Sequence, residues 1–175
     1  MHLYFIRHGE STSNYGELIT GRQNAQLTNL GRVQASAAGH LIAGKGIKID
    51  RIICSPLDRA HDTAKLIANE INYPEADIEV NGMVIERSFG EFEGQPSSVA
   101  KGLSDEAIVA GGGEIDAQIR ERAHLLLESL KNTEGNVLIV SHTGFGRRLR
   151  AVILGVATHE TQNFKNADFT DLGEI

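Results

Sequence analysis

The chain has 175 residues, of which 41% are hydrophobic and 23% are charged, and its formal net charge at neutral pH is -6. This length suits one domain, which buries roughly 70% of the surface that its unfolded chain exposes. The negative charge argues against a general binder of nucleic acids or anionic membranes, so any anion must be held by a local cluster of cations. We expect a single domain over residues 1–175.

Two further features indicate the compartment. Cys54 is the only cysteine, so no disulfide can form within the chain and a reducing compartment is expected. The sequence opens without a basic leader and has no long apolar stretch, which predicts neither a signal peptide nor a membrane span. We expect a cytoplasmic protein, monomeric or homodimeric, without nucleic-acid or membrane partners.

The first predicted element is a short buried strand. Residues 3–6 form an apolar run without polar alternation, which is typical of a strand buried on both faces, and Arg7-His8-Gly9 follows at once. Residues 14–27 have no sustained period and predict a loop. Thr28 fits an N-cap. The helix after it has apolar residues at helical spacing, namely Leu30, Val33, Ala37 and Leu41.

A second strand and helix follow. Residues 49–54 predict the strand, and Ser55-Pro56 predicts the start of the helix, with serine as cap and proline in the first turn. Tyr73-Pro74 closes this helix, and residues 78–85 are extended with an interruption near Asn81-Gly82. The expected buried face of the helix consists of Ala60, Ala64, Ile67 and Ile71.

The last third repeats the pattern. Residues 97–113 have only a weak helical tendency, whereas residues 114–131 predict a clear amphipathic helix. A continuous apolar strand is expected over 137–140, a helix over 145–154 and a final strand within 164–172. Strands that alternate with helices predict an α/β fold with three layers, in which a mainly parallel sheet carries helices on both faces.

Three of the buried strands end in polar residues: Arg-His-Gly at 7–9, Ser-Pro-Leu-Asp-Arg at 55–59 and Ser-His-Thr-Gly at 141–144. Parallel strands bring these ends to one edge of the sheet, where open α/β sheets bind ligands and helix N-termini favour anions. Two arginines and two histidines should therefore converge there and hold an anion. A purely structural interpretation needs carboxylates beside these cations, for which Glu10 and Glu86 are available.

The order of four motifs carries a resemblance. RHGESTSN, SPLDRAHDTA, ERSFGEFEG and SHTG follow one another between residue 3 and about residue 150 as they do in the histidine phosphatase superfamily, also called the phosphoglycerate mutase-like family. No single motif is specific, but their order is. The resemblance implies the three-layer phosphoglycerate mutase-like fold, with neither a cofactor nor a metal.

The resemblance also implies roles. His8 matches the histidine that attacks phosphorus and becomes a phosphohistidine, and Glu86 matches the proton donor. The other members of the phosphate pocket match Arg7, Arg59 and His142. Further contacts to phosphate or substrate are expected from Asn14, Thr20, Gly21, Arg87 and Thr143.

Chemistry supports these roles independently. An alkoxide is a poor leaving group, so a carboxylic acid must protonate the bridging oxygen, and fixed arginines stabilise the phosphoryl charge. A zinc site at His8, His142 and Glu86 is disfavoured by the adjacent arginines. Cys54 with Arg59 is one residue short of a Cys-x5-Arg phosphatase loop and contains a proline, so we interpret this cysteine as a buried strand residue. Two interpretations exist for three further arginines, a helix face that lines the site or a solvated helix surface, and we favour the solvated surface: Arg147, Arg148 and Arg150.

We therefore expect a phosphomonoester hydrolase that acts on a small phosphorylated metabolite through a phosphohistidine. A phosphoglycerate mutase is the alternative with the same chemistry, but mutases of the family carry a long insertion after the ER motif, and only 27 residues separate Glu86 from Glu114 here. A binding module for phosphorylated ligands, without catalysis, is the alternative from another class. Retention of both histidines argues against that alternative.

Overall fold

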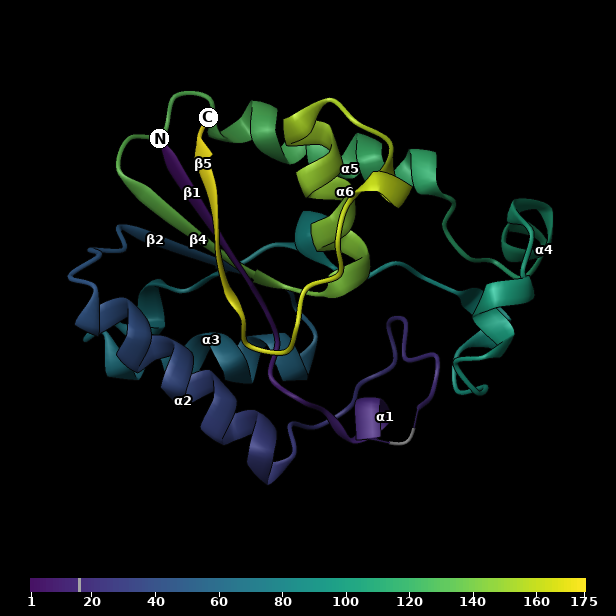
Figure 1. Cartoon of the computed structure of the whole chain (residues 1–175), viewed down its shortest axis with the longest axis horizontal. Coiled ribbons are helices and arrows are strands. Elements are labelled where there is room, and N and C mark those ends of the chain that lie inside the picture. Colours follow the sequence, from purple (N-terminus) through teal and green to yellow (C-terminus); the bar gives the residue numbers. More distant parts are fainter. Residues whose placement is uncertain (16) are drawn as a thin grey trace.

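A five-stranded sheet forms the centre of the protein in a computed structural model that describes residues 1–15 and 17–175 (Figure 1). The strands lie in the order β3-β2-β4-β1-β5, and all neighbours are parallel except β5, which runs antiparallel to β1. Their bounds are His2–Arg7 (β1), Arg51–Cys54 (β2), Glu79–Val80 (β3), Asn136–Ser141 (β4) and Phe169–Glu174 (β5).

Helices cover both faces of this sheet. Helices α2 and α3 lie on one face and α5 and α6 on the other, while α4 lies to one side of the sheet (Figure 1). The helix bounds are Thr12–Tyr15 (α1), Asn29–Gly44 (α2), Asp58–Glu70 (α3), Asp105–Ala110 (α4), Asp116–Leu130 (α5) and Thr143–Leu154 (α6). The predicted three-layer α/β fold with a mainly parallel sheet is confirmed.

The strands supply both halves of the core because successive side chains point to opposite faces. In β1, Tyr4 and Ile6 pack in the cluster beneath α2 and α3, whereas Leu3 and Phe5 pack in the cluster beneath α5 and α6. The central strands β1 and β4 are thus buried on both sides, as their continuous apolar sequences predict.

The predicted face of α2 is wrong, although Thr28 caps the helix as expected and accepts a hydrogen bond from the Gly31 backbone N–H. Leu30, Val33 and Leu41 are exposed, and so is Ala37. The buried face consists of small residues and one isoleucine: Gly31, Ala35, Ala38, Gly39 and Ile42. Close packing between α2 and α3 selects this face because a Cβ added to Gly39 would lie only 2.6 Å from the Cβ of Glu70.

Helix α3 also begins later than predicted. Its N-cap is Leu57 rather than Ser55, and its last residue is Glu70, before the predicted stop at Tyr73-Pro74. Three of the four predicted core residues of α3 are buried, namely Ala60, Ala64 and Ile67. The segment of weak helical tendency, 97–113, holds a 3-10 turn at Val99–Gly102 and then α4, and the final strand β5 lies at the end of the predicted range and beyond it.

Within the described residues, no helix combines the length and the apolar character that crossing a membrane requires.

Candidate active site

Polar side chains gather at the edge of the sheet where β1, β2 and β4 end. His8 follows β1, His142 follows β4, and Arg59 lies in the first turn of α3 after β2. The parallel pairing of these strands brings the three segments together, as predicted. A cavity of about 200 Å³ opens beside them, and its walls include Arg7, His8, Asn14, Thr20, Gly21, Arg59, Glu86 and Thr143.

His8 is held in one orientation and is only 4% exposed. Its Nδ1 lies 2.7 Å from the Gly9 carbonyl oxygen, which can only accept, so Nδ1 carries the proton and Nε2 keeps its lone pair. The Nε–H of Arg59 donates to this Nε2 at 3.3 Å. Burial, followed by the charges of Arg59 and Arg7, holds the pKa of His8 well below its usual range. His8 is therefore a neutral imidazole at pH 7 with its nucleophilic nitrogen toward Arg59.

His142 is fully buried, and the centre of its ring lies 5.1 Å from that of His8. Its Nε2 lies 2.7 Å from the hydroxyl oxygen of Ser55, which itself accepts a hydrogen bond from the Leu57 backbone N–H. If the Ser55 hydroxyl donates to Nε2, the proton of the neutral ring resides on Nδ1. Burial, followed by the charge of Arg59, holds the pKa of His142 well below its usual range, so the ring is neutral.

The two arginines of the pocket use part of their donor capacity on backbone carbonyls. Arg59 is 1% exposed and donates to the carbonyl oxygens of Gly21 and Gln23, each at 2.7 Å. Arg7 donates to the carbonyl oxygen of Phe164 at 3.0 Å. Burial lowers the pKa of Arg59 to about 10 and also lowers that of Arg7, although both remain cationic at pH 7.

The nearby carboxylates act on these arginines only at a distance: after the larger, opposite effect of burial, the charge of Glu86 raises the pKa of both. Within the described part of the chain, neither Arg7 nor Arg59 forms a salt bridge, while Glu10 accepts a hydrogen bond from the Thr28 hydroxyl instead. Two buried side-chain nitrogens have no hydrogen-bond partner among the described residues, Nε of Arg7 and Nδ1 of His142. Buried polar atoms without a partner are rare, and a bound anion would accept a hydrogen bond from each of these nitrogens that carries a proton.

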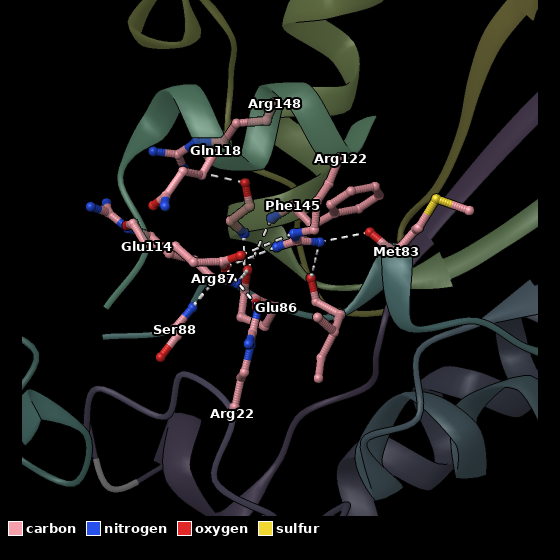
Figure 2. A network of polar contacts seen from close by, with 12 residues as sticks. Arg22, Met83, Glu86, Arg87, Ser88, Glu114, Gln118, Arg122, Phe145 and Arg148 are labelled. Carbon is pink, nitrogen blue, oxygen red and sulfur yellow. Dashed lines mark hydrogen bonds and ion pairs between the residues drawn. The ribbon is translucent and has the colours of Figure 1, made fainter. Parts of the chain in front are cut away.

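Glu86 lies on the segment between β3 and α4, beside the N-terminus of α6 (Figure 2). Its carboxylate oxygens accept hydrogen bonds from the backbone N–H groups of Gly144, Phe145 and Arg87, at 3.0, 2.9 and 2.8 Å. A Cβ at Gly144 would lie 2.3 Å from the Glu86 Oε1 atom, so any larger residue there would displace this carboxylate. The carboxyl group is thus fixed at the wall of the cavity.

The remaining predicted contacts lie around the same cavity, except one. Asn14 accepts from Asn166, whose amide also donates to the His8 carbonyl oxygen at 3.0 Å, and Thr20 donates to Ser13. Thr143 lines the cavity at the start of α6. Arg87 instead lines a neighbouring cavity of about 310 Å³, which shares Glu86, Phe89, Ala100 and Thr143 with the first.

Sequence reasoning missed several residues of this region. Ser55 contacts His142 instead of capping α3, and only the spatial position of His142 reveals this. Arg147 and Arg148 are half-buried and line the second cavity, so their interpretation as a solvated face was wrong. Arg150 stacks on Phe164, 4.1 Å from the ring centre. The position of these arginines directly after the SHTG motif was the sequence signal that could have placed them near the site.

The competing catalytic interpretations find little support. Burial raises the pKa of the Cys54 thiol to about 11, so the thiolate that a cysteine nucleophile needs is scarce at pH 7. Over residues 1–15 and 17–175, no three His, Cys, Asp or Glu side chains are grouped in a way that could hold a metal ion.

Comparison with known proteins identifies relatives of this chain. An acid phosphatase of Mycobacterium tuberculosis is 33% identical over 153 residues, which are 83% of this chain and 71% of that protein. A 2,3-bisphosphoglycerate-dependent phosphoglycerate mutase of a Methylobacterium species is 33% identical over 140 residues, 78% of this chain. The match spans only 64% of that mutase.

Solved structures show the same fold. A mycobacterial glucosyl-3-phosphoglycerate phosphatase superposes with a TM-score of 0.84 at 24% identity, over 97% of this chain and 91% of that one. The alpha-ribazole phosphatase of Shigella flexneri superposes with a TM-score of 0.81 at 25% identity, over 97% and 88%. The family model of the histidine phosphatase superfamily, branch 1, matches residues 3–173. This chain therefore belongs to the histidine phosphatase superfamily.

Proposed function

We propose that this protein hydrolyses small phosphomonoesters through a phosphohistidine at His8. The observation that carries the proposal is a pair of buried nitrogens, Nε of Arg7 and Nδ1 of His142, that have no hydrogen-bond partner among the described residues and belong to the same pocket as a neutral His8. Buried Arg59 and half-buried Arg7, neither of which forms a salt bridge within the described chain, fit a dianionic phosphoryl group.

In the first step, Nε2 of His8 attacks phosphorus, and the bond from phosphorus to the bridging oxygen breaks. Arg7, Arg59 and His142 donate hydrogen bonds to the phosphoryl oxygens, where the charge resides during transfer. As phosphorus approaches Nε2, the Nε–H of Arg59 exchanges its bond to His8 for one to a phosphoryl oxygen. Glu86 gives its proton to the departing alkoxide, which leaves as an alcohol.

In the second step, water replaces the alcohol beside Glu86. The Glu86 carboxylate removes a proton from the water, its oxygen bonds to phosphorus, and the bond from phosphorus to Nε2 breaks. Inorganic phosphate leaves, His8 is again neutral, and Glu86 is again protonated. No proton or phosphoryl group is left over at the end of the cycle.

The neighbouring cavity would receive the alcohol part of the substrate. It begins at Glu86 and is lined by four cations: Arg87, Lys101, Arg147 and Arg148. Arg87 and Arg148 lie close enough that the charge of Arg148 helps to lower the pKa of Arg87, after the larger effect of burial. An alcohol that carries a carboxylate or a second phosphate would offset this repulsion, so we propose such acidic phosphomonoesters as the preferred substrates.

A phosphoglycerate mutase is the second candidate because relatives with that name match at comparable identity. A mutase must keep water away from the phosphohistidine. The segment between Glu86 and Glu114 has 27 residues and contains only 3-10 turns and the six-residue α4. This short cover favours hydrolysis over transfer.

The test is phosphate release from p-nitrophenyl phosphate in the presence of a chelator. We expect wild-type protein to release phosphate and His8→Ala to be inactive, with a phosphorylated histidine trapped in acid-labile form on the wild-type chain only. His40→Ala, an exposed histidine on α2, is the matched control and should retain activity. Phosphate binding without release by wild-type protein would instead support a binding module, and faster transfer between the 2- and 3-positions of phosphoglycerate than hydrolysis would support a mutase.

A further inference from the structure

We infer that Glu114 is a positioning residue for Glu86: it organises two arginines that fix the backbone on both sides of the proposed acid. The inference rests on the proposed function, because it concerns the same phosphoryl transfer. Glu114 lies just before α5 and points into the protein, with Arg22 and Arg122 directed toward its carboxylate (Figure 2).

The carboxylate of Glu114 is shared between segments that are distant in sequence. Arg122 of α5 binds it through two nitrogens, at 3.1 and 3.0 Å, and Arg22 binds it at 2.9 Å. The backbone N–H of Ser88 donates to the same carboxylate at 3.2 Å. A single side chain thus connects α5, the loop after α1 and the segment that carries Glu86.

The contacts reach the backbone on both sides of Glu86. On the N-terminal side, Nη1 of Arg122 donates to the carbonyl oxygens of Met83 and Ile85, at 2.6 and 3.0 Å. On the C-terminal side, Arg87 donates to the Glu114 carbonyl oxygen at 2.8 Å, in addition to the Ser88 contact. The Glu86 carbonyl oxygen itself accepts from Nε of Arg22 at 3.1 Å. Rotation of this segment would break several of these bonds at once.

Arg22 also belongs to the loop that supports the phosphate pocket. Its neighbours Gly21 and Gln23 supply the two carbonyl oxygens that hold Arg59. Glu93 reinforces this connection, since its carboxylate accepts from the backbone N–H groups of both Arg22 and Phe89 at 3.0 Å. Arg22 therefore connects the backbone of Glu86, the proposed acid, to the loop that holds Arg59, the proposed phosphate-binding arginine.

Burial and charge indicate that the cluster of Arg22, Glu114 and Arg122 depends most on Glu114. The side chains of Glu114 and Arg122 are each 18% exposed, and that of Arg22 is 36% exposed. Burial opposes ionisation of Glu114, but the hydrogen bonds and charges of Arg122 and Arg22 outweigh it and lower the pKa of the carboxyl group. Without this carboxylate, two neighbouring arginines would repel each other and leave their positions.

Leaving-group chemistry separates this role from a merely structural one. Nitrophenolate leaves without a proton, so transfer of the phosphoryl group from p-nitrophenyl phosphate to His8 depends little on the position of Glu86, whereas an alkyl phosphate such as glycerol 3-phosphate needs the proton. The later attack of water, in which Glu86 acts as base, is common to both esters and does not enter kcat/KM. A displaced Glu86 therefore lowers kcat/KM for the alkyl ester much more than for the aryl ester. A general loss of folded protein lowers both equally.

The experiment measures kcat/KM for both esters with Glu114→Gln. We expect kcat/KM for glycerol 3-phosphate to fall by about 100-fold, the size expected for misplacement by about 1 Å. For p-nitrophenyl phosphate we expect a fall of about tenfold or less, which includes the effect through Arg22 on Arg59. Glu121→Gln, the same substitution at an exposed position of α5, should change neither value.

Two further variants keep the result decisive. Glu86→Gln measures how much more the alkyl ester loses than the aryl ester when the acid itself is absent. If Glu86→Gln shows no such selective loss, the proposed function is overturned rather than this inference. If Glu86→Gln shows the difference and Glu114→Gln does not, the positioning role is wrong. Should Glu114→Gln not fold, Arg22→Gln removes the contacts to Glu114 and to the Glu86 carbonyl oxygen and must produce the same selective loss for the alkyl ester.

Discussion

At the residue scale, three side chains of the pocket, those of His8, His142 and Arg7, each bond the protein through one nitrogen and keep another for a ligand. His8 donates from Nδ1 to its neighbour's carbonyl oxygen, and His142 uses Nε2 on Ser55. Arg7 uses Nη1 on Phe164 and keeps Nε free of any partner among the described residues. These contacts fix the orientation of both rings before a ligand arrives, and for the proposed phosphoryl transfer such preorganised donors need little reordering in the transition state.

Ser55→Ala tests whether the bond from Nε2 of His142 to the protein leaves its Nδ1 as a donor for the ligand. Without the hydroxyl, nothing described in the chain keeps the proton on Nδ1, so a share of the protein would present a lone pair to the phosphoryl group. We expect kcat/KM for p-nitrophenyl phosphate to fall about tenfold, the equivalent of one hydrogen bond of about 1 kcal/mol or slightly more. Ser98→Ala, at an exposed position, is the control. Unchanged kcat/KM in Ser55→Ala would show that the hydroxyl does not set the tautomer.

At the element scale, the site depends on how closely neighbouring helices and loops approach. Glycines mark these approaches: a Cβ on Gly9 would lie 2.2 Å from the Gly31 carbonyl oxygen, and Gly21 combines a φ of +49° with contact to Glu93. Both occur in loops that lead into the pocket. The sheet sets the directions of β1, β2 and β4, and these contacts set the final positions of the loops that follow them.

The interface between α2 and α3 allows a direct test. In Gly39→Ala the new Cβ would lie 2.6 Å from the Glu70 Cβ and 3.2 Å from the Ile67 Cα, which is backbone and cannot move away. We expect overpacking, of about 1–3 kcal/mol, to exceed the gain of about 1 kcal/mol in helix propensity, so urea unfolding should show a lower free energy of unfolding. Gly44→Ala, with open space around it in the same helix, should be neutral or stabilising. Equal effects at both positions would contradict the packing argument.

At the scale of the whole molecule, burial of two neutral histidines makes stability depend on pH. His8 and His142 have pKa values well below the usual range in the folded protein because of burial and neighbouring arginines, whereas the unfolded chain binds protons near pH 6.5. Above pH 6.5 both rings are neutral in the folded and in the unfolded state, so they do not make the free energy of unfolding depend on pH. As pH falls below 6.5, only the unfolded state gains protons, so the free energy of unfolding decreases.

Urea unfolding at pH 7.5 and pH 5.5 measures this effect. We expect a decrease of up to about 2.7 kcal/mol, with up to about 1.4 kcal/mol from each histidine. The double variant His8→Asn/His142→Asn should lose most of this decrease. The carboxyl groups whose pKa values are lowered by ion pairs, such as Glu114 and Glu79, act only below about pH 4.5 and do not contribute in this interval. A wild-type stability that is independent of pH here would show that the rings titrate normally.

The sequence by itself determined the α/β architecture and which polar segments converge at one edge of the sheet. Continuous apolar strands such as 137–140 can only be central, and three polar motifs directly after such strands must meet at one edge. Side chains that follow a strand end within one or two residues have little freedom to lie elsewhere. For that reason Arg7, His8, Arg59 and His142 could be placed together from their positions in the chain alone.

Only the tertiary structure decided which faces and partners the remaining residues use. The apolar residues of α2 recur at a spacing that is compatible with two different buried faces. Close approach to α3 selected the face of small residues over the face with Leu30 and Val33. Ser55 and Glu114 acquired their partners from segments 87 and 92 residues away, namely His142 and Arg22. A local pattern fixes backbone geometry and burial periodicity, but a hydrogen bond between distant segments exists only after the whole chain has packed.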